Sequence, residues 1–289
     1  MRNANEANLT DAVLAKLAGA QDPRFKEIMS SLIRHLHAFI RETGLTEKEW
    51  LTGIRFLTAT GKKCDDKRQE YILLSDTLGV SMLVDAINHR KPRGATETTV
   101  LGPFYVSGAK DMPMWADIAG DAQGEAAYVF GRVMDVDGNP IAGAVLDVWQ
   151  TDGEGFYDVQ RPGGNEQYAR GRFTTGVDGR YGFLTVKPVS YPVPTDGPVG
   201  KMLLGMGRHP YRPAHVHVIA TAPGFDRVAT HLFVEGDEYL DSDAVFGVKH
   251  SLVVDFKHRP AGRAPDGKES AVPFFTAEFD VRLVRSWGV

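Results

Sequence analysis

The stretch YVFGRVMDVDGNPIAGAVLDVWQ, residues 128–150, predicts two short strands joined by a turn. β-Branched and aromatic residues dominate both arms, and Asp, Gly, Asn and Pro gather between them, as is typical of turns. The stretch GRFTTGVDGRYGFLTV, residues 171–186, repeats this pattern. The runs AHVHVIATA, HLFVEG, SLVVDF and FDVRLV predict further strands. Short strands at this spacing are typical of an antiparallel β-sandwich.

The first ninety residues show helical periodicity instead. Asp22 and Pro23 form a typical helix start, and apolar residues then recur at helical spacing until Gly44. Another helical stretch is expected over about residues 65–89, with Gly79 as a candidate interruption.

The periodicity changes near residue 100. A connector rich in Gly and Pro, HRKPRGATETTVLGPFYVSGAKDMPM, separates the two patterns. We therefore predict an α+β chain, with a helical N-terminal region over residues 1–100 and a β-sandwich domain over residues 101–289.

Composition and charge narrow the function classes. The 289 residues carry a formal net charge of -4, which argues against nucleic acid as the main partner. No apolar run is long enough to span a bilayer, and the start MRNANEANLTDAV lacks a secretory pattern. Cys64 is the only cysteine, so an intrachain disulfide is excluded. A cytoplasmic enzyme or binding protein is expected.

The segment RPAHVHV, residues 212–218, carries the clearest chemical signal. His215 and His217 are two apart on a predicted strand, so both imidazoles project from one face. Such a pair forms half of a metal site, although two polar residues on a solvated sheet face fit the pattern equally well. Neither HExxH nor clustered CxxC is present, so the remaining ligands would carry oxygen. Tyr157 and Tyr191 lie in predicted loops, but spacing does not select them from the nine tyrosines.

Longer motifs indicate which tyrosines could be metal ligands. The run GRVMDVDGNPIAGAVLDVWQTDGEGFYD, followed in order by SYPVP and RPAHVHV, resembles the intradiol ring-cleaving dioxygenases, and the likeness spans about residues 25–257. The resemblance implies one non-haem Fe(III) per chain, held by Tyr157, Tyr191, His215 and His217. It further implies that Arg212 is catalytic and stabilises negative charge on the substrate. A homodimer through the helical region, with a bound phospholipid at its interface, is also implied.

The resemblance implies cleavage of a small aromatic diol or triol by O2, with Tyr191 as the tyrosine that substrate displaces. Its substrate-lining positions fall on two helical residues, a connector run and residues of the later strands and loops: Leu73, Asp76, Val100, Gly102, Pro103, Phe104, Val193, Pro194, Arg212, His231 and Val245.

Asp76 is the unusual member of this set, because a carboxylate among apolar residues is costly unless it meets a donor. The third hydroxyl of hydroxyquinol (benzene-1,2,4-triol) would be such a donor, although an N-cap or surface role for Asp76 also fits. LLSDTLGVSMLVDAI resembles the hydroxyquinol branch of the family, whose product is 3-hydroxy-cis,cis-muconate or maleylacetate. Catechol or chlorocatechol 1,2-dioxygenase is the nearer alternative. A non-catalytic β-sandwich binding module and a zinc hydrolase are the remote ones.

Overall fold

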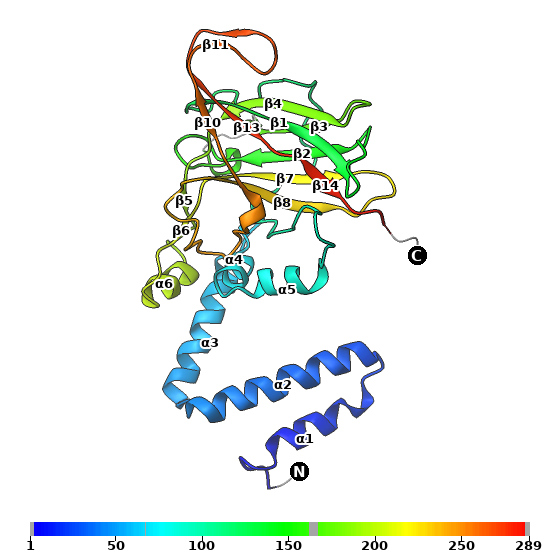
Figure 1. The fold of residues 1–289 in the computed structure, drawn as a ribbon. Helices are drawn as coiled ribbons and strands as arrows, with labels where there is room; N and C mark the ends of the chain where they lie inside the picture. Colours follow the sequence, from blue (N-terminus) through cyan, green and yellow to red (C-terminus); the bar gives the residue numbers. More distant parts are fainter. Residues whose placement is uncertain (1–2, 67, 162–166, 287–289) are drawn as a thin grey trace. The chain divides into compact units, whose positions relative to one another are not determined.

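The computed structural model describes residues 3–66, 68–161 and 167–286 (Figure 1). The chain divides into two compact units, with the division between Ala59 and Thr60. The helices that follow Thr60 and the Gly/Pro-rich connector belong to the same unit as the sheets. The functional division at residue 100 stays a prediction.

The first unit is helical. It contains α1 (Leu9–Ala15), a short 3-10 helix η1 (Lys16–Gly19), α2 (Pro23–Thr43) and most of α3 (Glu47–Lys62). The Asp22 side chain accepts from the backbone N–H groups of Arg24 and Phe25, and Gly44 ends α2 in the left-handed conformation. Both ends of α2 therefore follow the local sequence signals.

The second unit begins with the end of α3, followed by α4 (Glu70–Thr77) and α5 (Val80–Asn88); α6 (Pro198–Gly205) comes much later in the chain. Gly79 interrupts the predicted helical stretch. Its φ of 74° is left-handed, so α4 ends before it and α5 begins after it. α6 had no recognised signal in the sequence.

Two five-stranded sheets form the sandwich (Figure 1). One contains β1 (Ala126–Asp135), β4 (Arg180–Val186), β10 (Lys257–Arg259), β13 (Phe274–Glu278) and β14 (Val281–Leu283). The other has the order β3 (Arg170–Thr174), β2 (Val145–Gln150), β7 (His215–Thr221), β8 (Val228–Val234) and β9 (Val253–Val254). Two small ribbons pair β5 (Tyr191–Pro192) with β6 (Tyr211–Arg212), and β11 (Gly262–Arg263) with β12 (Glu269–Ser270). The short 3-10 helices η2 (Asp158–Gln160) and η3 (His250–Leu252) complete the described elements.

The core lies between the two sheets. Val129 and Phe183 from the first sheet and Leu146 and Val218 from the second belong to one buried apolar cluster. Phe173 of β3 stacks on Phe183 of β4, with ring centroids 5.1 Å apart. The α+β class and the sandwich are thus confirmed.

Some strand pairs are parallel, which the strand patterns did not indicate. β13 and β14 each run parallel to part of β1, and β9 runs parallel to β8. Parallel pairing requires a long connection between the two strands. Many residues separate β13 and β14 from β1 in the sequence, and the loop before β9 separates it from β8. Within the described residues, no helix is long and apolar enough to cross a membrane.

Candidate metal and substrate site

Three neighbouring strands carry a row of rings on one face of the second sheet. His217 of β7 lies opposite Trp149 of β2 on one side and opposite His231 of β8 on the other. The Trp149 ring stacks on His217, with centroids 4.5 Å apart and planes 12° apart. His215, two residues earlier on β7, points from the same face, as the alternation of strand side chains requires.

The two tyrosines reach this face from short elements beyond the strands. Tyr157 precedes η2 and is fully buried, with its ring stacked on Phe104 at 4.6 Å. Tyr191 begins the β5–β6 ribbon, whose register places it opposite Arg212. The structure thus brings Tyr157 and Tyr191, which lie in two separate segments, to the histidines of β7.

Their donor atoms converge. The Tyr157 hydroxyl oxygen lies 2.9 Å from that of Tyr191, 2.7 Å from His217 Nε2 and 3.5 Å from His215 Nε2. The two Nε2 atoms are 3.1 Å apart. His215 Nδ1 donates to the Pro213 carbonyl at 2.7 Å, so its Nε2 presents an unprotonated lone pair. Lone pairs that face one another at this distance repel unless a proton or a cation lies between them.

Burial keeps these groups neutral in the absence of a cation. It lowers the pKa of His215 to about 3, with the positive charge of Arg212 adding to the effect. It also lowers the pKa of His217 well below the ordinary value, with His215 as the next cause. Burial and the neighbouring Tyr191 raise the pKa of Tyr157, whereas the positive charge of Arg212 opposes the burial effect at Tyr191. Neutral imidazoles are the form in which histidine binds metal.

Arg212 lies buried beside this cluster. Its Nη1 is 3.2 Å from His215 Nε2, and its Nη2 is 3.4 Å from His231 Nδ1. On the other side, Asp243 pairs with its Nε and Nη2 at 3.1 and 3.3 Å. Burial works to lower the pKa of Arg212, but the Asp243 carboxylate keeps it above the ordinary value. The guanidinium is therefore a fixed cation at the edge of the donor set.

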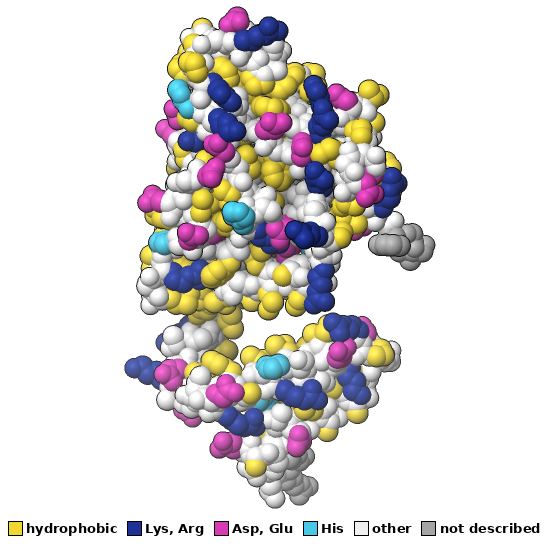
Figure 2. All heavy atoms as spheres, viewed as in Figure 1, with side chains coloured by type: hydrophobic (Ala, Val, Ile, Leu, Met, Phe, Trp, Pro, Cys, Tyr) yellow, Lys and Arg dark blue, Asp and Glu magenta, His cyan; other side chains and the backbone are white. Residues whose placement is uncertain are grey.

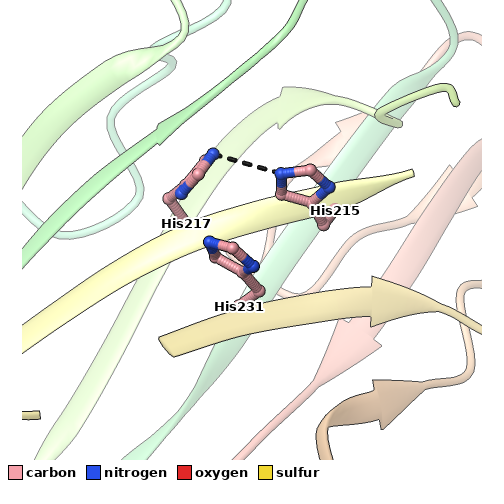
Figure 3. Close-up of side chains that lie close together, drawn as sticks. All are labelled: His215, His217 and His231. Carbon is pink, nitrogen blue, oxygen red and sulfur yellow. Dashed lines mark hydrogen bonds between the residues drawn. The ribbon is translucent and has the colours of Figure 1, made fainter. Parts of the chain in front are cut away.

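His231 adds a third imidazole. Among the described residues, His215, His217 and His231 form a buried group whose candidate ligand atoms lie within 4.8 Å of one another (Figure 3). The His231 ring stacks on that of His215 at 4.6 Å, and its Nδ1 faces Arg212. The group could hold a metal ion, and both His215 and His231 lie beside the Arg212 guanidinium.

The connector approaches the site closely. A Cβ on Gly102 would lie 3.3 Å from His217 Cε1, and the φ of Gly102 is 76°. Both features favour glycine at this position. Phe104 follows and stacks on Tyr157, while Val100 is buried.

A cavity of about 320 Å³ is lined by four of the predicted substrate-contacting residues, Leu73, Pro103, Phe104 and Pro194. The other residues around it include Arg68, Glu70, Val159 and Gln160. The remaining predicted contacts do not line this cavity. Gly102 lies beside His217, and the other six are buried: Asp76, Val100, Val193, Arg212, His231 and Val245.

Asp76 is buried on α4 and only 4% exposed, so neither a surface charge nor an N-cap describes it. Burial raises the pKa of its carboxyl, with a Ser81 hydrogen bond and the positive charge of Arg212 opposing the effect. Among the described residues no ion pair includes Asp76, and the nearby Arg212 is paired with Asp243. A further hydrogen-bond donor would therefore stabilise the charged form of this buried carboxyl.

Several supporting residues had no signal in the sequence. Asp243 pairs with Arg212, Trp149 stacks on His217, and Arg170 forms a buried ion pair with Asp158 beside Tyr157. Each pair is separated by at least twelve residues, so no local spacing could have indicated it.

Comparison with known proteins places the chain in a family. Residues 100–284 match the family model described as Dioxygenase, and residues 22–96 match the one described as Catechol dioxygenase N terminus. A 6-chlorohydroxyquinol 1,2-dioxygenase of Cupriavidus pinatubonensis is 54% identical over 91% of this chain and 95% of that protein. The structure of hydroxyquinol 1,2-dioxygenase from Pseudomonas putida DLL-E4 matches with a TM-score of 0.90 and 51% identity, covering 97% of this chain and 99% of that one.

Catechol enzymes are more distant. A catechol 1,2-dioxygenase of Candida albicans is 37% identical over 86% of this chain and 83% of that protein. Both halves of the chain, the converging donors and these likenesses agree, and the chain therefore belongs to the intradiol ring-cleavage dioxygenases.

Proposed function

We propose that this chain cleaves hydroxyquinol between its two adjacent hydroxyl-bearing carbons, using O2 and one ferric ion held by Tyr157, Tyr191, His215 and His217. The observation that carries the proposal is the convergence of two phenol oxygens and two imidazole nitrogens at 2.7 to 3.5 Å inside a buried site. Sequence identities of 54% with a 6-chlorohydroxyquinol dioxygenase and 51% with a hydroxyquinol dioxygenase, each over more than nine-tenths of the chain, support the choice of substrate.

The donor set fits a ferric ion. Phenolate is a hard, strongly donating anion, and two phenolates offset much of the charge of Fe(III). The His215 lone pair is already directed into the site by the Pro213 carbonyl, as expected of a metal-binding histidine. His231 belongs to the same buried group, but the family resemblance assigns the iron ligands to the two tyrosines, His215 and His217, so we propose His231 as a neighbour of the metal and not as a ligand.

When held by these four residues, a ferric ion would supply the chemistry that makes the ring carbons of a diol substrate reactive toward O2. The Tyr191 oxygen, which lies 2.9 Å from that of Tyr157, would hold one proton released by the incoming diol. Arg212, which faces Tyr191 across the β5–β6 ribbon, would stabilise negative charge on the substrate oxygens. Burial excludes water and strengthens both effects.

The first experiment is the visible spectrum of iron-loaded protein before and after anaerobic addition of hydroxyquinol, with catechol as the control. We expect a broad tyrosinate-to-iron band that shifts at lower concentrations of hydroxyquinol than of catechol. Admission of O2 should then consume one O2 per ring and yield the hydroxymuconate. Faster cleavage of catechol would favour the catechol 1,2-dioxygenase alternative. Protein that stays colourless after ferric reconstitution would instead point to a binding module without catalysis.

Asp76 is proposed to select hydroxyquinol by accepting a hydrogen bond from its third hydroxyl. A buried acceptor that loses its donor costs roughly 1–3 kcal/mol, so Asp76→Gly should lower the hydroxyquinol-to-catechol ratio of kcat/KM by about tenfold or more. Asp76→Asn keeps the side-chain shape and should lose less. Both variants are compared with wild type at equal iron content, and an unchanged ratio would remove the proposed contact.

The helical unit is proposed to form a homodimer. Phe25, Ile28, Leu32, Leu36 and Phe39 lie at helical spacing on α2, and each is between 47% and 54% exposed. Figure 2 shows apolar side chains at the surface of this unit. A stripe of this kind usually marks an interaction surface. A second copy of the chain would cover it, and a phospholipid acyl chain held at the interface would match its chemistry.

The dimer predicts a mass of two chains by light scattering in native protein, and a shift toward one chain in Leu32→Glu with Leu36→Glu. Lipid extraction of native protein tests the phospholipid separately. A monomeric wild type would contradict the dimer, and an extract without phospholipid would contradict the lipid.

A further inference from the structure

The strongest feature outside the donor set is the loop that holds Arg212. Asp243 and Arg212 are 4% and 3% exposed, and their side chains meet at two points, Nε to Oδ1 at 3.1 Å and Nη2 to Oδ2 at 3.3 Å. A two-point contact between a carboxylate and a guanidinium fixes both the position and the plane of the guanidinium. The Arg212 head is therefore held in one orientation.

That orientation faces the donor set. On the side away from Asp243, Arg212 Nη1 lies 3.2 Å from His215 Nε2. The backbone of Arg212 is fixed as well, since it pairs with Tyr191 in the β5–β6 ribbon. The guanidinium thus lies between a buried carboxylate and the atoms proposed to hold the metal.

The loop is built around the Asp243 carboxylate. Its Oδ1 accepts from the Val245 N–H at 3.2 Å, and its Oδ2 accepts from the Gly247 N–H at 2.9 Å. A Cβ on Gly247 would lie 3.0 Å from Arg212 Nη2 and 3.0 Å from Thr99 Oγ1. Phe246 between them has a φ of 61°, a left-handed conformation that is costly for a bulky residue. The loop thus adopts a strained backbone conformation in which the Asp243 carboxylate contacts the Arg212 guanidinium.

The same loop is joined to the helix that carries Asp76. Arg208 donates to the Thr77 carbonyl at 2.5 Å and to the Ala244 carbonyl at 2.9 Å. Its guanidinium also lies over the Phe246 ring, 4.6 Å from the centroid. Thr99 of the connector donates to the Gly247 carbonyl at 3.0 Å. Helix, connector and loop are therefore fastened together around Arg212.

We propose that Asp243 is a positioning residue for ring cleavage: its carboxylate, set by the loop of residues 243–247, fixes Arg212 against the donor set. The proposal rests on the proposed function and extends it to a residue without substrate contact. Asp243 acts through Arg212 alone, so its loss matters to catalysis only while the arginine is present. A buried ion pair that served stability alone would lack this dependence.

A double-mutant cycle tests that dependence. Wild type, Asp243→Asn, Arg212→Gln and the double variant are loaded with iron to equal content, and kcat and KM are measured with hydroxyquinol. We expect Asp243→Asn to lower kcat by about tenfold or more, and to change it less than about twofold when Arg212 is already Gln. Iron content and the visible band before substrate should match wild type in all four proteins.

Asp135→Asn is the matched control. Asp135 is also buried, accepts backbone N–H groups of Asp137 and Asn139, and lies 3.6 Å from Arg285, but it is the last residue of β1 and supports the turn that follows. Its loss should lower the melting temperature and leave kcat unchanged. If Asp243→Asn does not fold, Gly247→Ala is the second variant. Its added methyl group would lie 3.0 Å from Arg212 Nη2 and displace the guanidinium. It should lower kcat when Arg212 is present and change kcat little in the Arg212→Gln background.

An equal fold-loss of kcat in both Arg212 backgrounds, or a lowered melting temperature with kcat unchanged, would overturn the positioning role while the proposed function stands. Wild-type protein that binds iron but cleaves no ring would overturn the proposed function and the positioning role together.

Discussion

Tyr157→Phe is expected to purify with little iron and without the visible tyrosinate band. The Tyr157 oxygen is the atom on which the other donors converge, since it lies 2.9 Å from Tyr191, 2.7 Å from His217 and 3.5 Å from His215. Its replacement removes a ligand and leaves the polar atoms around it buried without that partner. We expect iron affinity and activity each to fall by about a hundredfold or more, since even a partner beyond the ligands is worth 10–100-fold. Iron content by mass spectrometry and the spectrum of the reconstituted protein measure both losses.

Tyr181→Phe is the matched control. Tyr181 is buried in the sandwich core, and its hydroxyl donates to the Phe279 carbonyl at 2.6 Å. Removal of that hydroxyl should cost about 1 kcal/mol of stability. Iron content and colour should not change. Equal iron in Tyr157→Phe and wild type would exclude Tyr157 as a ligand.

Arg212→Gln is expected to keep its iron and lose about 10²–10³ in kcat, the usual cost of removing one electrostatic stabiliser of a developing charge. The residue is fully charged over the working pH range, because Asp243 and the neighbouring tyrosines keep its pKa above the ordinary value despite burial. The pH dependence of kcat should therefore have the same shape in wild type and in Arg212→Gln, because Arg212 does not titrate in this range. Steady-state kinetics and metal analysis of the same preparation separate loss of rate from loss of iron.

Arg212→Lys refines this result. Lysine keeps the charge but cannot pair with both Asp243 oxygens in one plane, so its kcat should lie between wild type and Arg212→Gln. Wild-type kcat in Arg212→Gln, or a decrease that follows iron loss in proportion, would refute a role for the charge in catalysis.

Local structure followed directly from the sequence. Asp22 and Gly44 delimit α2, and Gly79 separates α4 from α5, because caps and left-handed breaks depend on residues only a few positions apart. The facing pair His215 and His217 was equally predictable, since alternation along a strand is a local property.

Strand pairing was decided only in three dimensions. The two predicted strand–turn–strand stretches both cross between the sheets, because β1 and β2 lie in different sheets, as do β3 and β4. The parallel return of β13 and β14 to β1 likewise joins distant segments. Turn residues specify that the chain reverses, but burial of side chains from both faces decides which sheet each strand joins.

Sequence patterns were therefore sufficient to predict the α+β class, the helix ends and the histidine pair, and longer motifs identified the family. The three-dimensional fold was needed to see that Tyr157 and Tyr191 meet those histidines, that Asp76 is buried, and that Asp243 pairs with Arg212. The difference lies in the sequence separation of the residues that interact. Caps and alternation act between near neighbours, whereas a buried donor cluster depends on packing that brings together residues far apart in the chain.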